Sequence, residues 1–295
     1  MPNEIQVKTV LNKTKRRDPW FLDDYTANPY SGCSFNCLYC YIRGSKYGTH
    51  MEEKLGIKVN SPEILEKNLA ARAKKGQYGI VVMASATDPY LHFEQDYQLT
   101  RRFLELFLKY RFPVHIITKS DLVIRDLDLL KEIDANAVLP AELEGKLSRK
   151  VFVTFSFSTL DDRVGAIFEP GATPPSTRLQ TLKTTLAAGF HSGVSLMPLL
   201  PWISDKGDIL EETYRTFSEA GVKYLFPATL TLFGADPSDS KPLVLRAVAR
   251  HYPELLEKYQ RFFDQSTEMP ARYREAFNRK TRELAARFNI KERII

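Results

Sequence analysis

All three cysteines of the chain lie in one short stretch, NPYSGCSFNCLYCYIR, which runs from residue 28 to residue 43. Their spacing, C-x3-C-x2-C, places Cys33, Cys37 and Cys40 within eight positions. Three thiols cannot all form disulfides, so a metal centre or a reactive thiol is the chemistry to consider. A structural zinc ion takes four ligands, and His50 could be the fourth. A [4Fe–4S] cluster on the same thiolates would keep one iron open to an exogenous ligand.

The elements that must position these thiols are indicated by an alternation of patterns along the chain. Short apolar stretches rich in β-branched residues favour strands, and segments of helical periodicity lie between them. The expected strands are residues 24–28, 78–84, 113–118, 150–157, 191–197 and 222–229. The expected helices are residues 62–75, 94–110, 125–133, 177–188 and 208–220.

This alternation predicts an α/β fold with a parallel sheet and right-handed crossovers. We expect the six strands to form a partial (β/α)6, TIM-like barrel that spans residues 1–240. After residue 240 the chain becomes rich in Arg, Glu, Tyr and Phe at helical spacing. Residues 241–295 are therefore predicted to be a C-terminal helical extension packed on the barrel.

Parallel α/β folds carry their functional groups in the loops that follow the carboxyl ends of the strands. The loops expected there include SATDPY, TKSD, SFSTLDD and MPLLPW, and they would meet the cysteine loop at one rim. In KVFVTFSFSTL, Thr154, Ser156 and Ser158 share one face of the strand, which favours a polar lumen. His115 is expected to be a core residue with satisfied hydrogen bonds.

The cysteine spacing, with an aromatic residue before the last cysteine, resembles the signature of the radical S-adenosylmethionine (radical SAM) superfamily. The full cysteine stretch, followed by SATDPY, TKSDLVIRDLDLL and RLQTLKTTLAAGF, is similar to the spore photoproduct lyase-related, DNA repair photolyase-like branch. The resemblance covers roughly residues 25–202 and fades over the rest of the chain.

The resemblance implies that Cys33, Cys37 and Cys40 hold a [4Fe–4S] cluster and that S-adenosylmethionine binds its open iron. Reduction by a flavodoxin- or ferredoxin-like donor would release methionine and a 5′-deoxyadenosyl radical, which would abstract a hydrogen atom from the substrate in a lyase-like or other reaction. Tyr39 and Tyr41 flank Cys40 as two tyrosines do in the spore lyase, where they are implicated in relaying a hydrogen atom. Alternatively, the two rings shield the cluster from water and tune its potential.

The resemblance also implies contacts to S-adenosylmethionine from residues at the strand ends, namely Ser85, Thr87, Asp88, Lys119, Ser156 and Met197. Thr87 matches a hydroxyl ligand at the methionine end, and Lys119 matches a lysine that reaches the carboxylate. Ser156 matches a serine near the ribose, and Met197 lies in the stretch that cradles adenine. An alternative for Asp88 is a turn with Pro89, in which the carboxylate bonds the local backbone.

Two further observations concern residues that the family also carries. Glu169 and Arg178 fit a family pattern of glutamate followed by arginine, although capping and surface pairing are alternative explanations. The spore lyase has a cysteine after the second strand that donates a hydrogen atom, whereas the corresponding position here is about Ser85. Since an O–H bond is far stronger than S–H, the sequence argues against spore-lesion repair by that route.

Charge and composition limit the remaining possibilities. The chain has 295 residues, a net charge of +6 and a pI near 9.0. No apolar run approaches the roughly 20 residues of a membrane helix, and the start lacks a signal-peptide core, so we expect a cytoplasmic protein without membrane contact. The basic run KTKRR and the basic tail permit a nucleic-acid substrate. A small molecule or peptide as the radical enzyme's substrate, or a non-catalytic zinc-binding (Cys3His) protein, are the alternatives.

Overall fold

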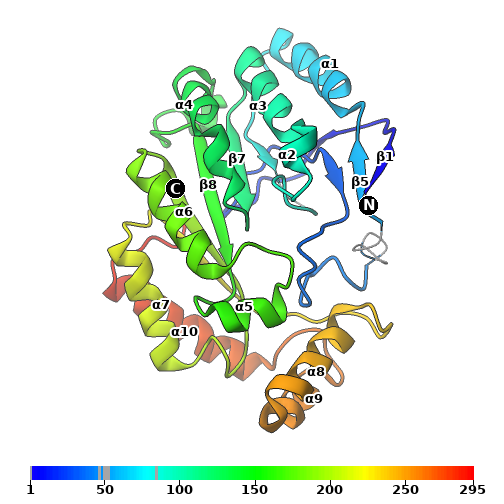
Figure 1. Ribbon diagram of the computed structural model, residues 1–295. Helices are drawn as coiled ribbons and strands as arrows, with labels where there is room; N and C mark the ends of the chain where they lie inside the picture. Colours follow the sequence, from blue (N-terminus) through cyan, green and yellow to red (C-terminus); the bar gives the residue numbers. More distant parts are fainter. Residues whose placement is uncertain (1, 46–47, 49–53, 84–85) are drawn as a thin grey trace.

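A seven-stranded sheet forms the centre of the structure, a computed structural model that describes residues 2–45, 48, 54–83 and 86–295 (Figure 1). The strand order is β10-β9-β8-β7-β6-β3-β2. Six strands pair in parallel and in chain order: β3 (Tyr25–Ala27), β6 (Val81–Met83), β7 (Val114–Thr118), β8 (Val151–Phe157), β9 (His191–Leu199) and β10 (Leu225–Thr229). Each lies within or overlaps a predicted strand, so the predicted parallel α/β fold is confirmed. The seventh strand, β2 (Leu11–Lys13), pairs antiparallel with β3.

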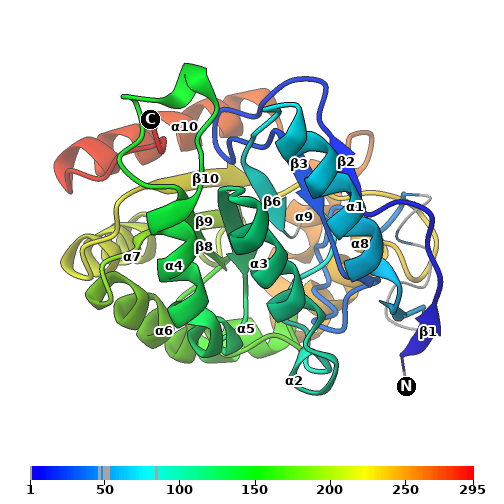
Figure 2. The ribbon, with the colours of Figure 1, turned by 90° about the horizontal axis from the view of Figure 1, so that it is seen from above.

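Helices cover the outer face of this sheet (Figure 2). They are α1 (Ser61–Lys74), α3 (Leu99–Tyr110), α4 (Leu127–Asn136), α6 (Pro175–Ala187) and α7 (Gly207–Glu219). Their apolar residues, such as Leu65, Phe107 and Leu182, share one buried core with Val153 and Phe155 of β8. The amphipathic spacing of the helices thus fixes which face of each strand turns outward.

Two helical predictions differ from the structure in detail. The segment 94–110 is two helices, α2 (Glu94–Tyr97) and α3, because Gln98 adopts a left-handed backbone with φ of 50° that ends the first helix. The segment 125–133 begins as the short 3₁₀ helix η1 (Leu122–Asp126) and continues as α4. An additional helix, α5 (Asp162–Phe168), was not predicted; the Asp161 carboxylate caps it by accepting from the Arg163 amide at 2.7 Å.

Among the described residues, no backbone pairing joins the two edge strands, so the sheet is an open, partial barrel. Residues 14–24, between β2 and β3, reach the other edge through aromatic contacts. Trp20 stacks on Phe226 of β10 with ring centroids 5.8 Å apart, and Phe21 meets the same ring edge-on at 5.7 Å. Side-chain packing therefore spans the gap that strand pairing leaves.

A hydroxyl of β8 takes part in a buried hydrogen-bonded path. His115 Nδ1 lies 2.8 Å from the Phe21 carbonyl, and its Nε2 lies 2.6 Å from Thr154 Oγ1. Because a carbonyl only accepts, Nδ1 carries the proton and Thr154 donates to Nε2. Thr154 in turn contacts the Tyr224 hydroxyl at 2.7 Å. His115 is fully buried and satisfied, which confirms its predicted place in the core.

A second, three-stranded sheet supports the cysteine stretch from the side. Its order is β1 (Asn3–Ile5), β5 (Gly56–Lys58) and β4 (Tyr30–Ser31). The Asn60 side chain both accepts from the Val7 amide and donates to its carbonyl, each at 2.9 Å, so it holds the N-terminal segment beside β5. Strand β4 leads directly into the first cysteine.

The last part of the chain is helical, with α8 (Ser240–His251), η3 (Pro253–Leu255), α9 (Leu256–Phe263) and α10 (Ala271–Arg287). In Figure 1, α8 and α9 lie near α5, at the end toward which β8 points. Their apolar residues form a second core with Tyr39 and Phe168. Helix α10 packs on α7 and β10 instead. A domain division at residue 240 stays a prediction.

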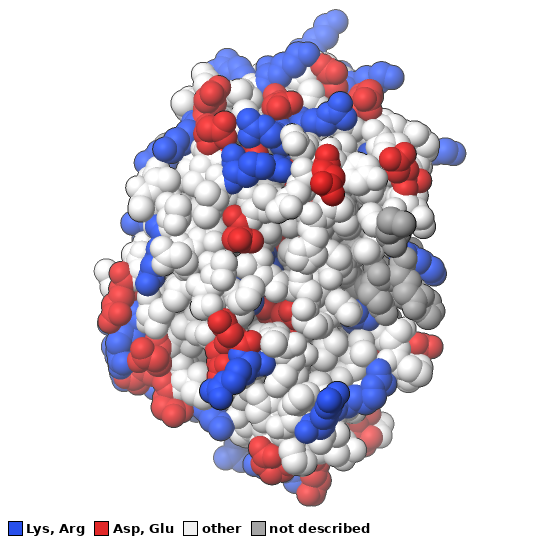
Figure 3. Space-filling model, viewed as in Figure 1, with Lys and Arg blue, Asp and Glu red and all other residues white. Residues whose placement is uncertain are grey.

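The surface in Figure 3 carries both signs of charge. Lys and Arg residues alternate with Asp and Glu residues over this face, and neither sign forms a continuous patch. Within the described part of the chain, no helix is long and apolar enough to cross a membrane.

Candidate functional site

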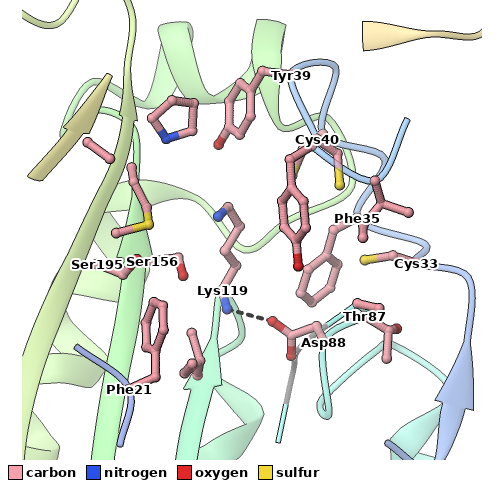
Figure 4. Close-up of a pocket in the computed structure, with 18 of the residues that line it drawn as sticks. Phe21, Cys33, Phe35, Tyr39, Cys40, Thr87, Asp88, Lys119, Ser156 and Ser195 are labelled. Atoms are coloured by element: carbon pink, nitrogen blue, oxygen red, sulfur yellow. Dashed lines mark hydrogen bonds between the residues drawn. The ribbon is translucent and has the colours of Figure 1, made fainter. Parts of the chain in front are cut away.

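The carboxyl ends of the parallel strands surround a cavity of about 540 Å³ (Figure 4). The cysteine loop, residues 32–43, forms one wall, with Cys33 and Cys40 opposite Ser156 of β8 and Ser195 of β9. The cavity collects the three cysteines and seven other predicted site residues, namely Tyr39, Tyr41, Thr87, Asp88, Lys119, Ser156 and Met197. Ser85 and His50 lie outside the described residues.

The cysteine loop is held by the last residue of α5 and by the segment that follows it. The Leu38 amide donates to the Phe168 carbonyl at 2.9 Å, and the Gly171 amide donates to the Phe35 carbonyl at 3.0 Å. A Cβ on Gly171 would lie 2.3 Å from the Ser34 carbonyl oxygen, so only glycine allows this approach. The loop is thus fixed by backbone contacts that do not involve the thiols.

Thr87 and Asp88 both make protein contacts at the end of β6. The Thr87 hydroxyl donates to the carbonyl of Gly32, the residue before Cys33, and so ties the two loops together. Asp88 accepts from the Tyr90 amide at 2.9 Å, from the Thr118 hydroxyl at 2.7 Å and from the Lys119 amide at 2.8 Å. The carboxylate therefore makes the local turn and also joins the ends of β6 and β7 (Figure 4). Burial raises its pKa.

A buried carboxylate fixes the first of the two tyrosines. The Tyr39 hydroxyl donates to Glu169, which also accepts from the Ser158 hydroxyl at 2.8 Å and pairs with Arg178. Glu169 and Arg178 are 2% and 0% exposed, so the alternative of surface pairing is wrong. Burial alone would raise the pKa of Glu169, but the charges of Arg178 and Lys119 and the hydrogen bonds outweigh it and lower the pKa.

The second tyrosine differs from the first in its surroundings. Tyr41 is 58% exposed and lies at the cavity, whereas Tyr39 is 5% exposed and packs with the apolar residues of α8 and α9. Their positions on either side of Cys40 therefore give one anchored ring and one accessible ring.

Lys119 contributes the positive charge of the cavity. It is the only Lys or Arg among the described residues that line it, and its Nζ lies 6.0 Å from the centroid of the Tyr39 ring. Burial raises the pKa of the Cys37 and Cys40 thiols, and the Lys119 charge opposes that rise. The ammonium thus favours anionic groups in the cavity, whether thiolates or a carboxylate of a ligand.

Comparison with known proteins identifies the family to which the chain with this cavity belongs. A sequence model of the radical SAM superfamily matches residues 27–217, which include the cysteine loop and strands β4 to β9. The chain belongs to the radical SAM superfamily. Membership in this superfamily makes it an enzyme of radical-initiated chemistry, and the superfamily uses S-adenosylmethionine together with an iron–sulfur cluster.

Two relatives and one solved structure show what this radical SAM protein is similar to. An uncharacterised protein of Mycobacterium tuberculosis is 28% identical over 295 residues, covering 98% of this chain and 81% of the relative. A protein of Pseudomonas phage M6, named a radical SAM Nα-GlyT isomerase, is 23% identical over 195 residues, or 66% of this chain and 37% of its own. A spore photoproduct lyase variant solved with S-adenosylmethionine and dinucleoside spore photoproduct superposes with a TM-score of 0.60 and 15% identity, over 90% of this chain and 74% of its own. The last comparison shows a shared fold.

The thiols of the radical SAM cavity fit a multi-iron cluster. Each thiol is partly accessible, and burial raises the pKa of Cys33 to about 12. Binding of a metal would replace the thiol protons, because the thiolate is the form that ligates. Among the described residues, no three His, Cys, Asp or Glu side chains gather around the position of a single metal ion. A [4Fe–4S] cluster takes each thiolate on a different iron, so the three thiols of this cavity could hold one. The zinc alternative needs His50 as its fourth ligand, and His50 lies outside the described residues.

Several residues that line the cavity were not predicted from the sequence, and two of them come from an unexpected segment. Phe21 and Asp23 line the cavity from the segment between β2 and β3, which carries no strand or helix pattern. Asp23 accepts from the Asp18 amide at 2.7 Å, which holds the turn. The only sequence feature that could have indicated their role is DPWFLDD, in which two adjacent aromatic residues lie within a charged stretch.

Proposed function

We propose that Cys33, Cys37 and Cys40 bind a [4Fe–4S] cluster whose fourth iron binds S-adenosylmethionine, and that the enzyme abstracts a hydrogen atom from a substrate in the cavity. The observation that carries this proposal is that all three thiols and Lys119 open on one cavity at the carboxyl ends of the strands. When bound and reduced by one electron from a flavodoxin- or ferredoxin-like donor, cluster and S-adenosylmethionine supply methionine and a 5′-deoxyadenosyl radical.

The protein's part in this reaction is binding and orientation. The Lys119 ammonium attracts the carboxylate of the methionine moiety, and the Ser156 hydroxyl is available to the ribose across the cavity. Met197 and Pro198, at the end of β9, offer an apolar surface to adenine. Apolar residues such as Phe21, Phe35 and Ile117 exclude water, which protects a reactive carbon radical.

The two tyrosines take separate parts in the proposed function. The Tyr39 hydroxyl is engaged by Glu169 and its ring packs beneath the cysteine loop, so Tyr39 shields the cluster. Tyr41 lies exposed at the cavity and is placed to touch the substrate. A role in hydrogen-atom relay therefore suits Tyr41 better than Tyr39.

As substrate class we propose a nucleic-acid component. This part rests on the names of relatives, since the spore lyase binds a dinucleoside photoproduct, and on the net charge of +6. The segment 14–24 adds support, because it carries the basic residues Lys15 and Arg16 and also contributes Phe21 to the cavity wall. A peptide or small-molecule substrate is the opposing outcome.

The deciding experiment is anaerobic incubation of the reduced, reconstituted protein with S-adenosylmethionine, followed by assay of 5′-deoxyadenosine. The wild-type protein should form 5′-deoxyadenosine, and Cys37→Ala should form none, because one corner of the cluster loses its ligand. Ser156→Ala is the matched comparison: it also removes one polar atom from the cavity wall but leaves the cluster ligands intact, and it should retain activity with a raised KM for S-adenosylmethionine.

Two results would contradict the proposal. A colourless protein with a single zinc ion per chain would replace the radical enzyme by the zinc-binding alternative. Equal 5′-deoxyadenosine formation by the wild type and Cys37→Ala would show that the cysteine loop is not the cluster site.

A further inference from the structure

Arg43, three residues after the last cysteine, is buried against the cysteine loop itself. Its side chain is among the largest fully buried ones of the described chain, with 1% exposure. Nε donates to the Cys37 carbonyl at 3.1 Å, and Nη2 donates to Asn36 Oδ1. Both acceptors belong to the turn that carries the second cysteine.

That turn includes a residue with a left-handed backbone. Asn36 has a φ of 53°, a conformation that asparagine adopts more readily than other residues except glycine. The Cys37 carbonyl accepts from the Cys40 amide at 3.2 Å as well as from Arg43. A single guanidinium thus contacts both the left-handed Asn36 and the Cys37 carbonyl, which itself bonds the Cys40 amide.

The same side chain reaches a segment far along the chain. Arg43 Nη1 donates to the Ser238 carbonyl at 2.9 Å, across 195 positions of sequence. Gly44 lies directly on this segment: its φ is +82°, and a Cβ there would be 2.8 Å from Phe233 Cβ. The Arg43–Gly44 pair therefore docks the end of the cysteine loop on residues 233–238.

The receiving loop is ordered by its own hydrogen bonds. The Ser238 amide and hydroxyl both donate to Asp236 Oδ1, at 3.0 and 2.8 Å. The Phe233 amide donates to the Ser240 hydroxyl at 2.9 Å, at the start of α8. The Ser238 carbonyl is thus presented by a preformed turn, which makes it a fixed point for the guanidinium.

We propose that Arg43 is a positioning residue that sets the place of Cys37 and Cys40 by tying the cysteine loop to residues 233–238, so that retention of the cluster depends on the C-terminal part of the chain. This inference rests on the proposed cluster site and extends it. The planar guanidinium suits the task because it donates to three acceptors in fixed, diverging directions, which a lysine ammonium on a flexible stem does not.

The test measures iron and sulfide per chain in the full-length, anaerobically reconstituted protein, and the rate at which a ferrous chelator removes the iron. Arg43→Met should lose iron about tenfold faster than the wild type. This is the lower end of the loss in metal affinity that follows when a residue that orients a metal ligand is removed. Arg43→Lys should remain closer to Arg43→Met than to the wild type. Gly44→Ala, which keeps Arg43 but pushes the loop off Phe233, should also lose iron faster.

Arg149→Met is the matched control, since it removes an arginine paired with Asp134 at 2.9 Å before the first residue of β8, at the opposite end of the sheet. It should retain iron like the wild type. Thermal unfolding of the apo forms shows whether a variant is still folded, so that a misplaced cysteine loop can be told from loss of the fold. If Arg43→Met does not fold, the iron retention of Gly44→Ala and Arg43→Lys tests the inference instead. Wild-type iron retention in these variants overturns the inference, whereas a wild-type protein that binds no iron and sulfide contradicts the proposed function instead.

Discussion

At the scale of single residues, the site depends on buried charges that satisfy one another. Glu169 receives hydrogen bonds from Tyr39 and Ser158 and pairs with Arg178, which also donates to the Ser156 carbonyl. A buried ion pair adds little net stability compared with apolar residues, but removal of one partner leaves an uncompensated charge. The pair therefore fixes the Tyr39 ring and the end of β8 with respect to each other.

We expect Arg178→Met to destabilise the protein by about 3–5 kcal/mol, because the Glu169 carboxylate would remain buried without its cation. The measurement is the free energy of unfolding from urea titration. The control is Arg163→Met on the neighbouring α5. This arginine side chain is 93% exposed and its nearest carboxylate oxygen, on Asp161, is 3.7 Å away, so the pair is weak and little change in stability is expected.

A double variant sharpens this prediction. Glu169→Gln/Arg178→Met removes both charges and should lose less stability than Arg178→Met alone. If Arg178→Met is no less stable than Arg163→Met, the buried pair does not hold the site in the way described.

At the scale of elements, strands and loops from distant parts of the chain are joined across the lumen by one hydrogen-bonded path. It runs from the Phe21 carbonyl in segment 14–24 through His115 of β7 and Thr154 of β8 to Tyr224, beside β10. The neutral imidazole is essential here, because Nε2 must accept from Thr154 while Nδ1 donates. Protonation of His115 would break the path at Thr154.

Burial lowers the pKa of His115 from 6.5 to about 4, and that of His191 likewise to about 4. The unfolded chain binds these protons first, so the stabilisation is fully present above pH 6.5 and is lost as the pH falls toward 4. For His115 the loss is on the order of 3 kcal/mol. Urea titrations between pH 7.5 and 4 should show it.

The variant His115→Asn isolates this contribution, since its amide can still donate to the Phe21 carbonyl but does not titrate. Its stability should fall less steeply than that of the wild type between pH 6.5 and 4. Parallel pH profiles for the two proteins would mean that His115 does not titrate in this range.

At the scale of the whole molecule, a segment near the N-terminus lines the cavity that the parallel sheet creates, and the C-terminal part supports the cysteine loop from outside it. Segment 14–24 contacts β10 across the open side of the sheet, and residues 233–263 pack on the cysteine loop and Tyr39. The net charge of the chain is +6, and on the face shown in Figure 3 Lys and Arg residues are interspersed with Asp and Glu residues. A local group of cations is therefore the feature to test for binding of a polyanion.

The basic run beside the cavity makes the nucleic-acid proposal testable. We expect the affinity for a short single-stranded DNA to fall linearly on a log–log plot against salt concentration. Lys15→Gln/Arg16→Gln should weaken binding and reduce the slope by about 0.7 for each phosphate that the protein no longer neutralises. Lys74→Gln/Lys75→Gln at the end of α1, an equally exposed pair, should leave the slope unchanged. Fluorescence anisotropy measures both, and no binding even at low ionic strength would favour a peptide or small-molecule substrate.

The amino-acid sequence alone determined the parts of this protein that depend on local patterns. The spacing of the three cysteines limits their chemistry, and the alternation of strands and helices predicts the parallel sheet. Because the carboxyl ends of parallel strands share one edge, the loops after β6 to β9 could be assigned to one cavity from the order of the elements alone. The resemblance to the radical SAM superfamily then implied Tyr41, Lys119, Ser156 and Met197 as site residues, and all four line the cavity.

The tertiary structure decided what depends on contacts between distant residues. The burial of Glu169 with Arg178 and the place of Phe21 in the cavity wall have no signature in a single sequence. The same holds for the hydrogen bond from Arg43 to a carbonyl 195 positions away. The short strands β1, β4 and β5 likewise form only because they pair with one another. Such contacts arise when the chain closes over many residues, and a local pattern carries no information about which distant segment will lie beside it.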